Sequence, residues 1–185
     1  MKKIKPLFII ALLILVACEA DYKPKPMGYF RFDLPKHEYV EFTSECGYQL
    51  DIPNYSKMYP GKEECWNNLF IVPVRGTVHL THQKITGDIN QFLAASQDLV
   101  YEHTSKADGI KQSVFENSDT KVYGMLYELI GNAASSVQFY VTDSTDNFLR
   151  GALYFNSAPN KDSLAPLVTF AAEDIRHMIS SLEWN

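Results

Sequence analysis

The stretch KVYGMLYELIG, residues 121–131, alternates between two apolar faces. Successive side chains of a β-strand point to opposite faces of the sheet, so alternate positions share a face. One face consists of Tyr123, Met125, Tyr127 and Leu129, and the other of Val122, Leu126 and Ile130. A sheet with two apolar faces needs a covering layer on each. The stretch therefore predicts a central strand that is buried on both sides.

Segments on either side of this strand complete an antiparallel meander. They have the composition of strands and are separated by short polar turns, as hairpins are. The predicted strands are 110–117 (IKQSVFEN), 121–131, 135–144 (SSVQFYVTDS) and 147–156 (NFLRGALYFN).

Two helices are predicted to flank this sheet. The first spans residues 88–103, with Asp88 as its N-cap and Gln91 three positions later. Its buried face is Ile89, Phe92, Leu93, Ser96, Leu99, Val100 and His103. The second begins near Asp162 or Ser163. Its apolar stripe is Leu164, Leu167, Val168, Ala171, Ile175, Met178, Ile179 and Leu182.

The first half of the chain adds short strands to this plan. We expect them at 28–35, 38–44, 47–53, 69–74 and 76–85, with an irregular segment at 53–68. The fold class is therefore α+β, an antiparallel β-sheet flanked by helices. The order of elements resembles the Mog1/PsbP type of sandwich, a resemblance that carries no function with it.

The N-terminus has the pattern of a lipoprotein leader. A basic flank and an apolar run too short to span a bilayer lead to Leu15-Val16-Ala17-Cys18, a lipobox. We expect residues 1–17 to be a signal peptide that is removed, and Cys18 to carry the acyl chains that hold the protein on a membrane. Residues 18–27 form a proline-punctuated tether. Residues 28–185 form one domain.

The charge of the mature chain excludes some partners. Removal of the leader's three lysines leaves 14 of the 17 basic residues against 22 acidic residues. A chain this acidic repels nucleic acid and anionic lipid surfaces, so we expect no nucleic-acid partner. Attachment to the membrane must therefore depend on the acyl chains of Cys18.

Cys46 and Cys65 remain as an even pair once Cys18 is lipidated. In an oxidising compartment they favour a disulfide, which would stabilise the fold by about 3 kcal/mol. Two reduced, buried thiols are the alternative, because the sequence does not give the geometry of the pair.

No motif assembles catalytic or metal-binding groups. GxSxG, HExxH and CxxC are absent from the sequence, so we expect no catalytic residue, no cofactor and no enzymatic activity. His79 and His82 lie three apart on a predicted strand and face opposite sides, which argues against a shared metal ion. His103 is expected at the rim of its helix. The run 143–147 is rich in oxygen ligands but lacks the spacing of an EF-hand, so a hairpin turn is preferred to a calcium site.

Arg150 is the most informative single residue of the meander. It lies in the apolar strand FLRGALYF, where an unpaired buried charge would cost several kcal/mol. Pairing with a carboxylate such as Glu128 is the first interpretation, and contact with an acidic group of a partner is the second. A third places its head in water at a sheet edge. The aromatic residues gathered between Tyr22 and Phe70 likewise serve either as cover for a sheet edge or as a docking surface.

Several blocks resemble the gliding motility lipoprotein GldD family of gliding Bacteroidota. They are KPKPMGYFR at 23–31 with Leu34-Pro35, residues 131–156, PNKDSL at 159–164, and DIRHMISSLEW at 174–184. The resemblance implies an accessory component of gliding motility and type IX secretion that contacts other envelope proteins and has no attributed enzymatic activity. Cys18 is the one residue whose role it transfers.

Two other functions remain as alternatives. One is a periplasmic lipoprotein that binds peptidoglycan or another ligand, and the weaker one is an envelope hydrolase, for which His79, His82, His103 and His177 would be the candidate groups. For the location we expect the outer membrane, facing the periplasm, because a short tether suits a domain that works near its lipid surface. The inner membrane is the alternative.

Overall fold

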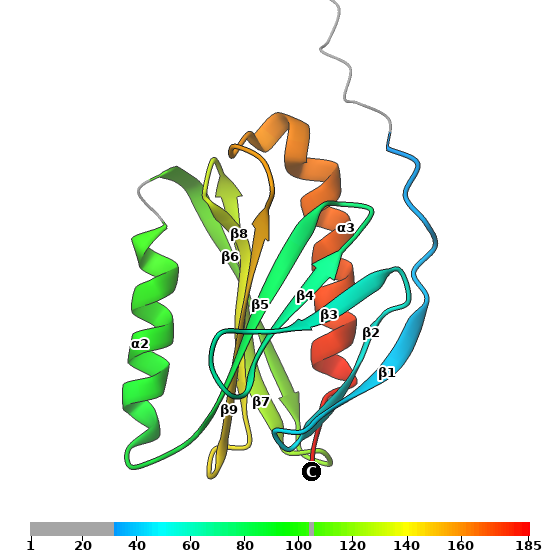
Figure 1. The fold of residues 1–185 in the computed structure, drawn as a ribbon. Coiled ribbons are helices and arrows are strands. Elements are labelled where there is room, and N and C mark those ends of the chain that lie inside the picture. The colour runs from blue at the N-terminus through cyan, green and yellow to red at the C-terminus, as the bar shows by residue number, and fades with distance from the viewer. Residues whose placement is uncertain (1–31, 104–105) are drawn as a thin grey trace, which may run out of the picture.

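The structure, a computed structural model, describes residues 32–103 and 106–185. The predicted signal peptide 1–17, the lipid-bearing Cys18 and the tether 18–27 lie outside these residues. Figure 1 shows one helix on each side of a large β-sheet, and a small second sheet beside the C-terminal helix. This is the α+β arrangement that the sequence predicts.

The large sheet has seven antiparallel strands in the order β3-β4-β5-β9-β8-β7-β6. Their bounds are β3 Ser56–Pro60, β4 Trp66–Ile71, β5 Gly76–Lys84, β6 Ala107–Asn117, β7 Val122–Gly131, β8 Ser135–Thr142 and β9 Asn147–Phe155. The last four form the predicted meander, which is confirmed. β5 pairs with β9 along its whole length and so connects the first half of the chain to the meander.

The C-terminal helix, α3, spans Lys161–Ser180 and covers one face of the large sheet. The helix begins one to two residues earlier than predicted. Its N-cap is Asn160, whose side chain accepts a hydrogen bond from the Ser163 N–H at 3.1 Å. Ala171, Ile175 and Met178 of the predicted stripe are completely buried. They pack in one large core with β2 and with the strands of the sheet. This helix therefore fulfils its predicted role.

The other helix, α2, spans Ile89–Glu102 and covers its face of the sheet only in part. Asp88 is the N-cap, as predicted, and accepts a hydrogen bond from the Asn90 N–H. Val100 packs against Tyr127 and Leu129 of β7 in a small second core. Leu99, which was expected on the buried face, is 40% exposed. Few side chains of α2 are buried, so α2 covers its face of the sheet less completely than α3 covers the other face.

The small sheet consists of β1 Tyr39–Ser44, β2 Tyr48–Pro53 and β10 Glu183–Trp184. The helix α3 lies between β2 and strands β6, β7 and β8 (Figure 1). The predicted strand 28–35 is wrong for its described part, because residues 32–38 form no strand. The predicted irregular segment 53–68 is also wrong, because it contains β3. Pro60 is compatible with β3, since β3 is an edge strand.

A buried carboxylate connects this small sheet to α3. Asp174 of α3 is completely buried and accepts hydrogen bonds from the Tyr55 hydroxyl at 2.8 Å and from the Tyr39 hydroxyl at 3.2 Å. The Nδ1 atom of His37 lies 2.7 Å from its Oδ1 atom. Burial raises the pKa of Asp174, although these hydrogen bonds act in the opposite direction. The carboxylate is therefore tolerated in the core because three donors surround it.

Cys46 and Cys65 form a disulfide in the structure, with Cα atoms 5.5 Å apart. Cys46 follows β1 and Cys65 precedes β4, so the bond links the small sheet to the large one. The structure thus supplies the geometry that the sequence leaves open. The oxidation of the pair in the cell remains a prediction.

Replacing Asp174 with alanine should lower the free energy of unfolding by about 3 kcal/mol, because three half-buried donors would lose their acceptor. Glu173→Ala is the matched control, because the Glu173 side chain is 64% exposed and lies 3.3 Å from His37 of the same cluster. We expect the control to cost less than about 1 kcal/mol. Urea unfolding of the full chain in detergent measures both values, and equal losses would contradict the role given to Asp174.

The disulfide predicts a specific labelling pattern for the mature protein. Alkylation of the unfolded chain should modify Cys46 and Cys65 only after treatment with a reductant, as mass spectrometry would show. The double serine variant should be less stable by about 3 kcal/mol, because the bond closes a loop with a sequence separation of 19 residues. Two modified cysteines without reductant would contradict the prediction.

Candidate functional site

Arg150 lies on the α2 side of the large sheet, and its predicted pairing with Glu128 is wrong. Glu128 shares the opposite face of β7 with Val122 and Leu126. There it contacts Arg176 of α3, and Lys111 lies 3.2 Å away. Burial acts to raise the pKa of Glu128, but these two cations outweigh it and lower the pKa. Side chains alternate between the two faces along each strand, and this alternation places Glu128 and Arg150 on opposite sides of the sheet. They therefore cannot form the predicted pair.

The partner of Arg150 is an amide. Its Nη2 group donates a hydrogen bond to Oε1 of Gln138 at 2.6 Å. Gln138 lies on the neighbouring strand β8 and is 1% exposed. No carboxylate of the described residues lies within ion-pair distance of the guanidinium. Burial lowers the pKa of Arg150, but an arginine keeps its charge at any physiological pH.

Sequence reasoning missed Gln138, although a signal for it was present. In SSVQFYVT, Gln138 is two positions before Tyr140 and therefore lies on the same face of β8. Tyr140 pairs directly with Arg150 of β9. The register therefore places Gln138 and Arg150 on one face, two positions apart along the sheet. Predicting the contact would have required this register in addition to the strand assignments.

On the α2 side of the large sheet, the part formed by β3, β4, β5 and β9 is only partly covered, and we call this part the open face. Residues that pair directly across antiparallel strands share a face, so the ladder defines its members. On β9 the same ladder also places Phe148 and Ala152 on this side of the sheet, but both are buried and are not counted in the open face. The open face consists of Lys57, Tyr59, Trp66, Asn68, Phe70, Thr77, His79, Thr81, Gln83, Arg150 and Tyr154. All of these are half-buried or exposed, whereas the opposite sides of β4 and β5 are buried in the main core.

Of the four candidate histidines, His79 and His103 both lie against Tyr154, whereas His82 and His177 have other neighbours. His79 lies on the open face, where its Nδ1 is 2.6 Å from Oδ1 of Asn68. His82 is buried on the opposite side and contacts Asn147 at 3.1 Å, so the two face apart as predicted. Burial lowers the pKa of both imidazoles. Residues 32–103 and 106–185 contain no group of three or more metal-ligating side chains.

The other two candidate histidines also have local partners. His103 caps the end of α2, and its Nε2 lies 3.3 Å from the Tyr154 hydroxyl. His177 of α3 lies 3.0 Å from Asp51 and stacks on Tyr39 with ring centroids 3.6 Å apart. The structure therefore does not bring the four histidines together.

The run 143–147 forms the turn between β8 and β9. Oδ1 of Asp143 accepts hydrogen bonds from the backbone N–H groups of Thr145, Asp146 and Asn147 at 2.8–2.9 Å. Burial acts to raise the pKa of Asp143, but the hydrogen bonds outweigh it and lower the pKa to about 2. The carboxylate is thus oriented toward N–H donors, which is the arrangement of a hairpin turn.

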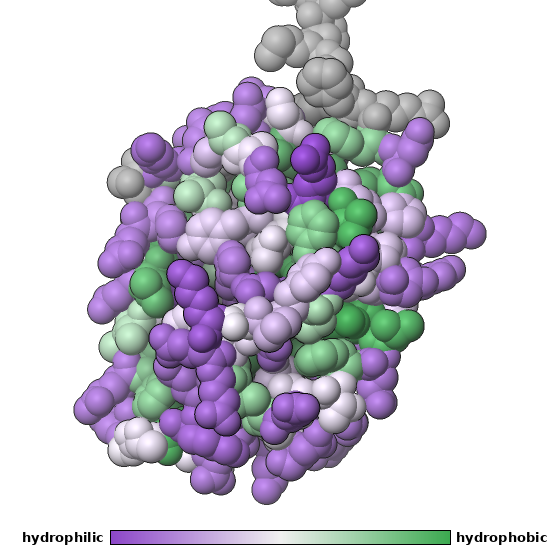
Figure 2. All heavy atoms as spheres, in the orientation of Figure 1, coloured by the Kyte–Doolittle hydropathy of each residue, from purple (hydrophilic) through white to green (hydrophobic). Residues whose placement is uncertain are grey.

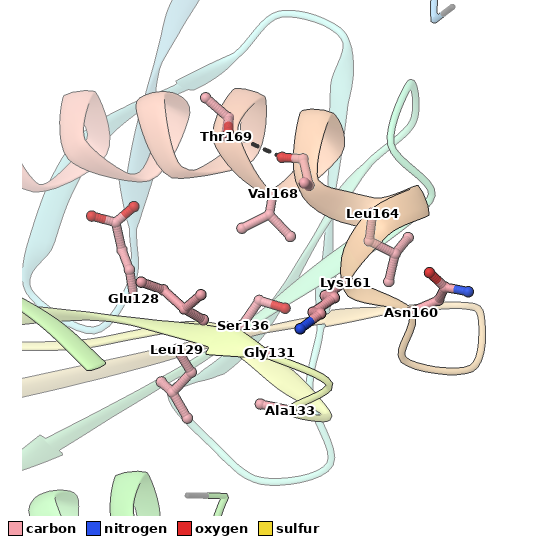
Figure 3. A pocket seen from close by; sticks show the side chains of 12 residues that line it. Glu128, Leu129, Gly131, Ala133, Ser136, Asn160, Lys161, Leu164, Val168 and Thr169 are labelled. Carbon is pink, nitrogen blue, oxygen red and sulfur yellow. Dashed lines mark hydrogen bonds between the residues drawn. The ribbon is translucent and has the colours of Figure 1, made fainter. Parts of the chain in front are cut away.

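A groove of about 210 Å³ opens between the first turns of α3 and the end of β7 (Figure 3). Figure 3 shows Leu164 and Val168 pointing from α3 toward the sheet, with Glu128 at one end of the groove. Ile130, which was predicted to be buried, is 58% exposed here because α3 diverges from the sheet. Lys161 at the rim is paired with Asp108 at 2.7 Å. The groove is therefore mainly apolar, and its charged lining residues already have partners.

These observations define an α+β sandwich with a sheet that is largely covered on one face and partly open on the other. The family described as gliding motility lipoprotein GldD has a model that matches residues 19–184. The chain belongs to this family. The match confirms the resemblance noted in the sequence and indicates a lipid-anchored protein of the cell envelope. In the part of the chain that the structure describes, neither helix is long and apolar enough to cross a membrane.

Two further comparisons complete the picture. A comparison with curated proteins found no match. Among solved structures, the chain is similar to the solution structure of cyanobacterial PsbP (CyanoP) from Synechocystis sp. PCC 6803, at 9% identity and a TM-score of 0.47. The similarity covers 87% of this chain and 100% of that chain, and it carries no conclusion about function.

The Asp143 turn predicts a pH-dependent stability. The folded pKa of about 2 lies below the ordinary value of 3.8, so the unfolded chain binds more protons between these values. The contribution of Asp143 is therefore complete above pH 3.8 and is lost as the pH falls through 2. Asp143→Ala should cost roughly 1 kcal/mol at neutral pH, and the difference from wild type should narrow in acid.

Asp146→Ala is the matched control, because the Asp146 carboxylate receives one hydrogen bond, from the Thr145 hydroxyl at 3.3 Å. Its effect should be small at every pH. Thermal unfolding between pH 2 and pH 7 measures both variants. A wild-type advantage over Asp143→Ala that is unchanged at pH 2 would contradict the role of the charge.

Proposed function

We propose that this lipoprotein is a non-catalytic accessory component of gliding motility and type IX secretion, which acts by contacting other envelope proteins. The observation that carries the proposal is the family match over residues 19–184, almost the whole chain. The dispersed histidines support the non-catalytic part, because acid–base chemistry requires groups that converge on one substrate. We expect the acyl chains on Cys18 to anchor the domain. We propose the outer membrane, facing the periplasm, because a short tether suits a domain that works near its lipid surface, and the inner membrane is the alternative.

The groove beside α3 supports a second candidate function. A concave, mainly apolar site of this kind suits a small periplasmic ligand or part of a peptidoglycan fragment. Sedimentation of the lipoprotein with purified cell wall separates the two candidates. A component that contacts only proteins stays in the supernatant, whereas a wall-binding module sediments.

Deletion of the gene should abolish colony spreading and reduce the secretion of type IX cargo. Wild-type protein expressed in trans should restore both, and Cys18→Ala should restore neither, because the domain would leave its membrane. Metabolic labelling with a palmitate analogue checks the loss of the acyl chains in that variant. Normal spreading and secretion in the deletion strain would refute the proposal.

Histidine variants test the non-catalytic part in the same strain. His103→Ala and His177→Ala should restore spreading as fully as the wild-type protein, because each imidazole has a local partner and is not a member of the sheet face that β3, β4, β5 and β9 leave partly open. His82 is buried, so its variant must first be shown to fold. A folded histidine variant that fails to restore spreading would favour an enzyme.

A further inference from the structure

The guanidinium of Arg150 has more hydrogen-bonding capacity than its surroundings use. The one hydrogen bond that the described residues make with it is the contact with Gln138. Its Nε atom is buried without a partner, and so is the Nε2 atom of Gln138. Both groups are donors, so they leave a need for an acceptor rather than for another cation. Native proteins seldom leave such groups unpaired unless the site has a further role.

The open face differs in charge from the rest of the chain. The chain has a formal net charge of −5, yet the open face contains no Asp or Glu. Its two permanently charged residues are Lys57 at the edge and Arg150 in the interior. Burial lowers the pKa of His79, the histidine of this face, and so favours its neutral form. The charge of this face is therefore complementary to an acidic partner.

Aromatic side chains share the sheet face of the guanidinium. Arg150, Thr81 and Trp66 form one row across β9, β5 and β4, which places Trp66 about 10 Å from Arg150. Phe70 and Tyr154 form a parallel row through Thr77. Figure 2 shows a mixed and largely pale area over β3, β4 and β5 between purple margins. An arginine among half-buried aromatic residues has the composition of a protein-binding hot spot.

We propose that the open face binds an acidic segment of a partner protein, with one carboxylate of that segment on Arg150 and its apolar side chains against Trp66 and Phe70. This inference rests on the proposed function, because it names the surface through which the lipoprotein contacts its neighbours. Gln138 is a positioning residue, since its Oε1 fixes the plane of the guanidinium. The fixed plane presents a fork of N–H groups that matches the two oxygens of a carboxylate.

The surroundings favour a protein carboxylate over a phosphate or a lipid headgroup. Phosphate sites gather several cations or backbone N–H groups, whereas a single guanidinium lies at the centre of this face. The acidic chain as a whole repels an anionic lipid surface. The aromatic rows need apolar side chains to cover them, and a peptide segment supplies both apolar groups and a charge.

The direct test uses wild-type full-length lipoprotein in detergent and two capped peptides, Ac-Phe-Glu-Phe-NH₂ and Ac-Phe-Gln-Phe-NH₂. NMR follows the Nε–H resonances of the arginines, with those of Arg150 and Arg176 assigned from their lysine variants. The glutamate peptide should shift the Arg150 signal with a Kd on the order of 1 mM. The glutamine peptide should bind at least about tenfold more weakly, and the Arg176 signal should not move. Absence of a shift, or equal shifts with both peptides, would overturn the proposal.

Variants extend the test to the surface. Arg150→Gln should lose the preference for the glutamate peptide, and Arg150→Lys should retain part of it. Arg176→Gln is the matched control, because it removes one positive charge on the opposite side of the sheet. A retained preference in a folded Arg150→Gln variant would overturn the proposal. The wild-type titration decides the question if that variant does not fold.

Complementation of the deletion strain separates the two proposals. If the deletion abolishes spreading and Arg150→Gln restores it fully, the open face is not the contact surface while the proposed function stands. If the deletion has no effect, the proposed function fails, and the peptide titration still decides whether the face binds acidic segments. Sedimentation with purified cell wall that depends on Arg150 would assign the face to the wall and overturn the choice of a protein partner.

Discussion

The buried carboxylate of Asp174 is the interaction on which the arrangement of the two sheets depends. It lies on the face of α3 turned away from the large sheet, and its donors come from His37, Tyr39 and Tyr55. A carboxylate in this position is costly unless hydrogen bonds surround it, so it stabilises only the arrangement in which the small sheet lies against the helix. The Cys46–Cys65 disulfide adds a covalent link between the small sheet and the large one.

The position of α3 explains why the large sheet is covered unequally. The helix contributes side chains to one core that extends from β2 through the helix to the interior of β8 and β9. On the other face, α2 places Val100 over β7 and β8 and leaves β3, β4 and β5 partly open. The residues left on that side are neither a conventional core nor an ordinary charged surface. They are aromatic, amide and hydroxyl side chains around one arginine.

This distribution suits a protein that works by contact. Each candidate histidine has a local hydrogen-bonding partner, and His79 and His103 both lie against Tyr154. A binding surface needs a desolvated centre with a polar rim, and the open face has both. Membership of the gliding motility lipoprotein family gives that surface a setting in the cell envelope.

The sequence by itself determined the meander, both helices and the family of the chain. Periodicity was sufficient for these because the two faces of β7 and the stripe of α3 depend on neighbours close in the chain. Only the tertiary structure decided the partner of Arg150. The register of β7, β8 and β9 places Glu128 and Arg150 on opposite faces of the sheet, and secondary-structure propensities do not specify this register. The edge strand β3 and the exposure of Leu99 and Ile130 were likewise decided by packing, because each depends on what lies beside it in space rather than in sequence.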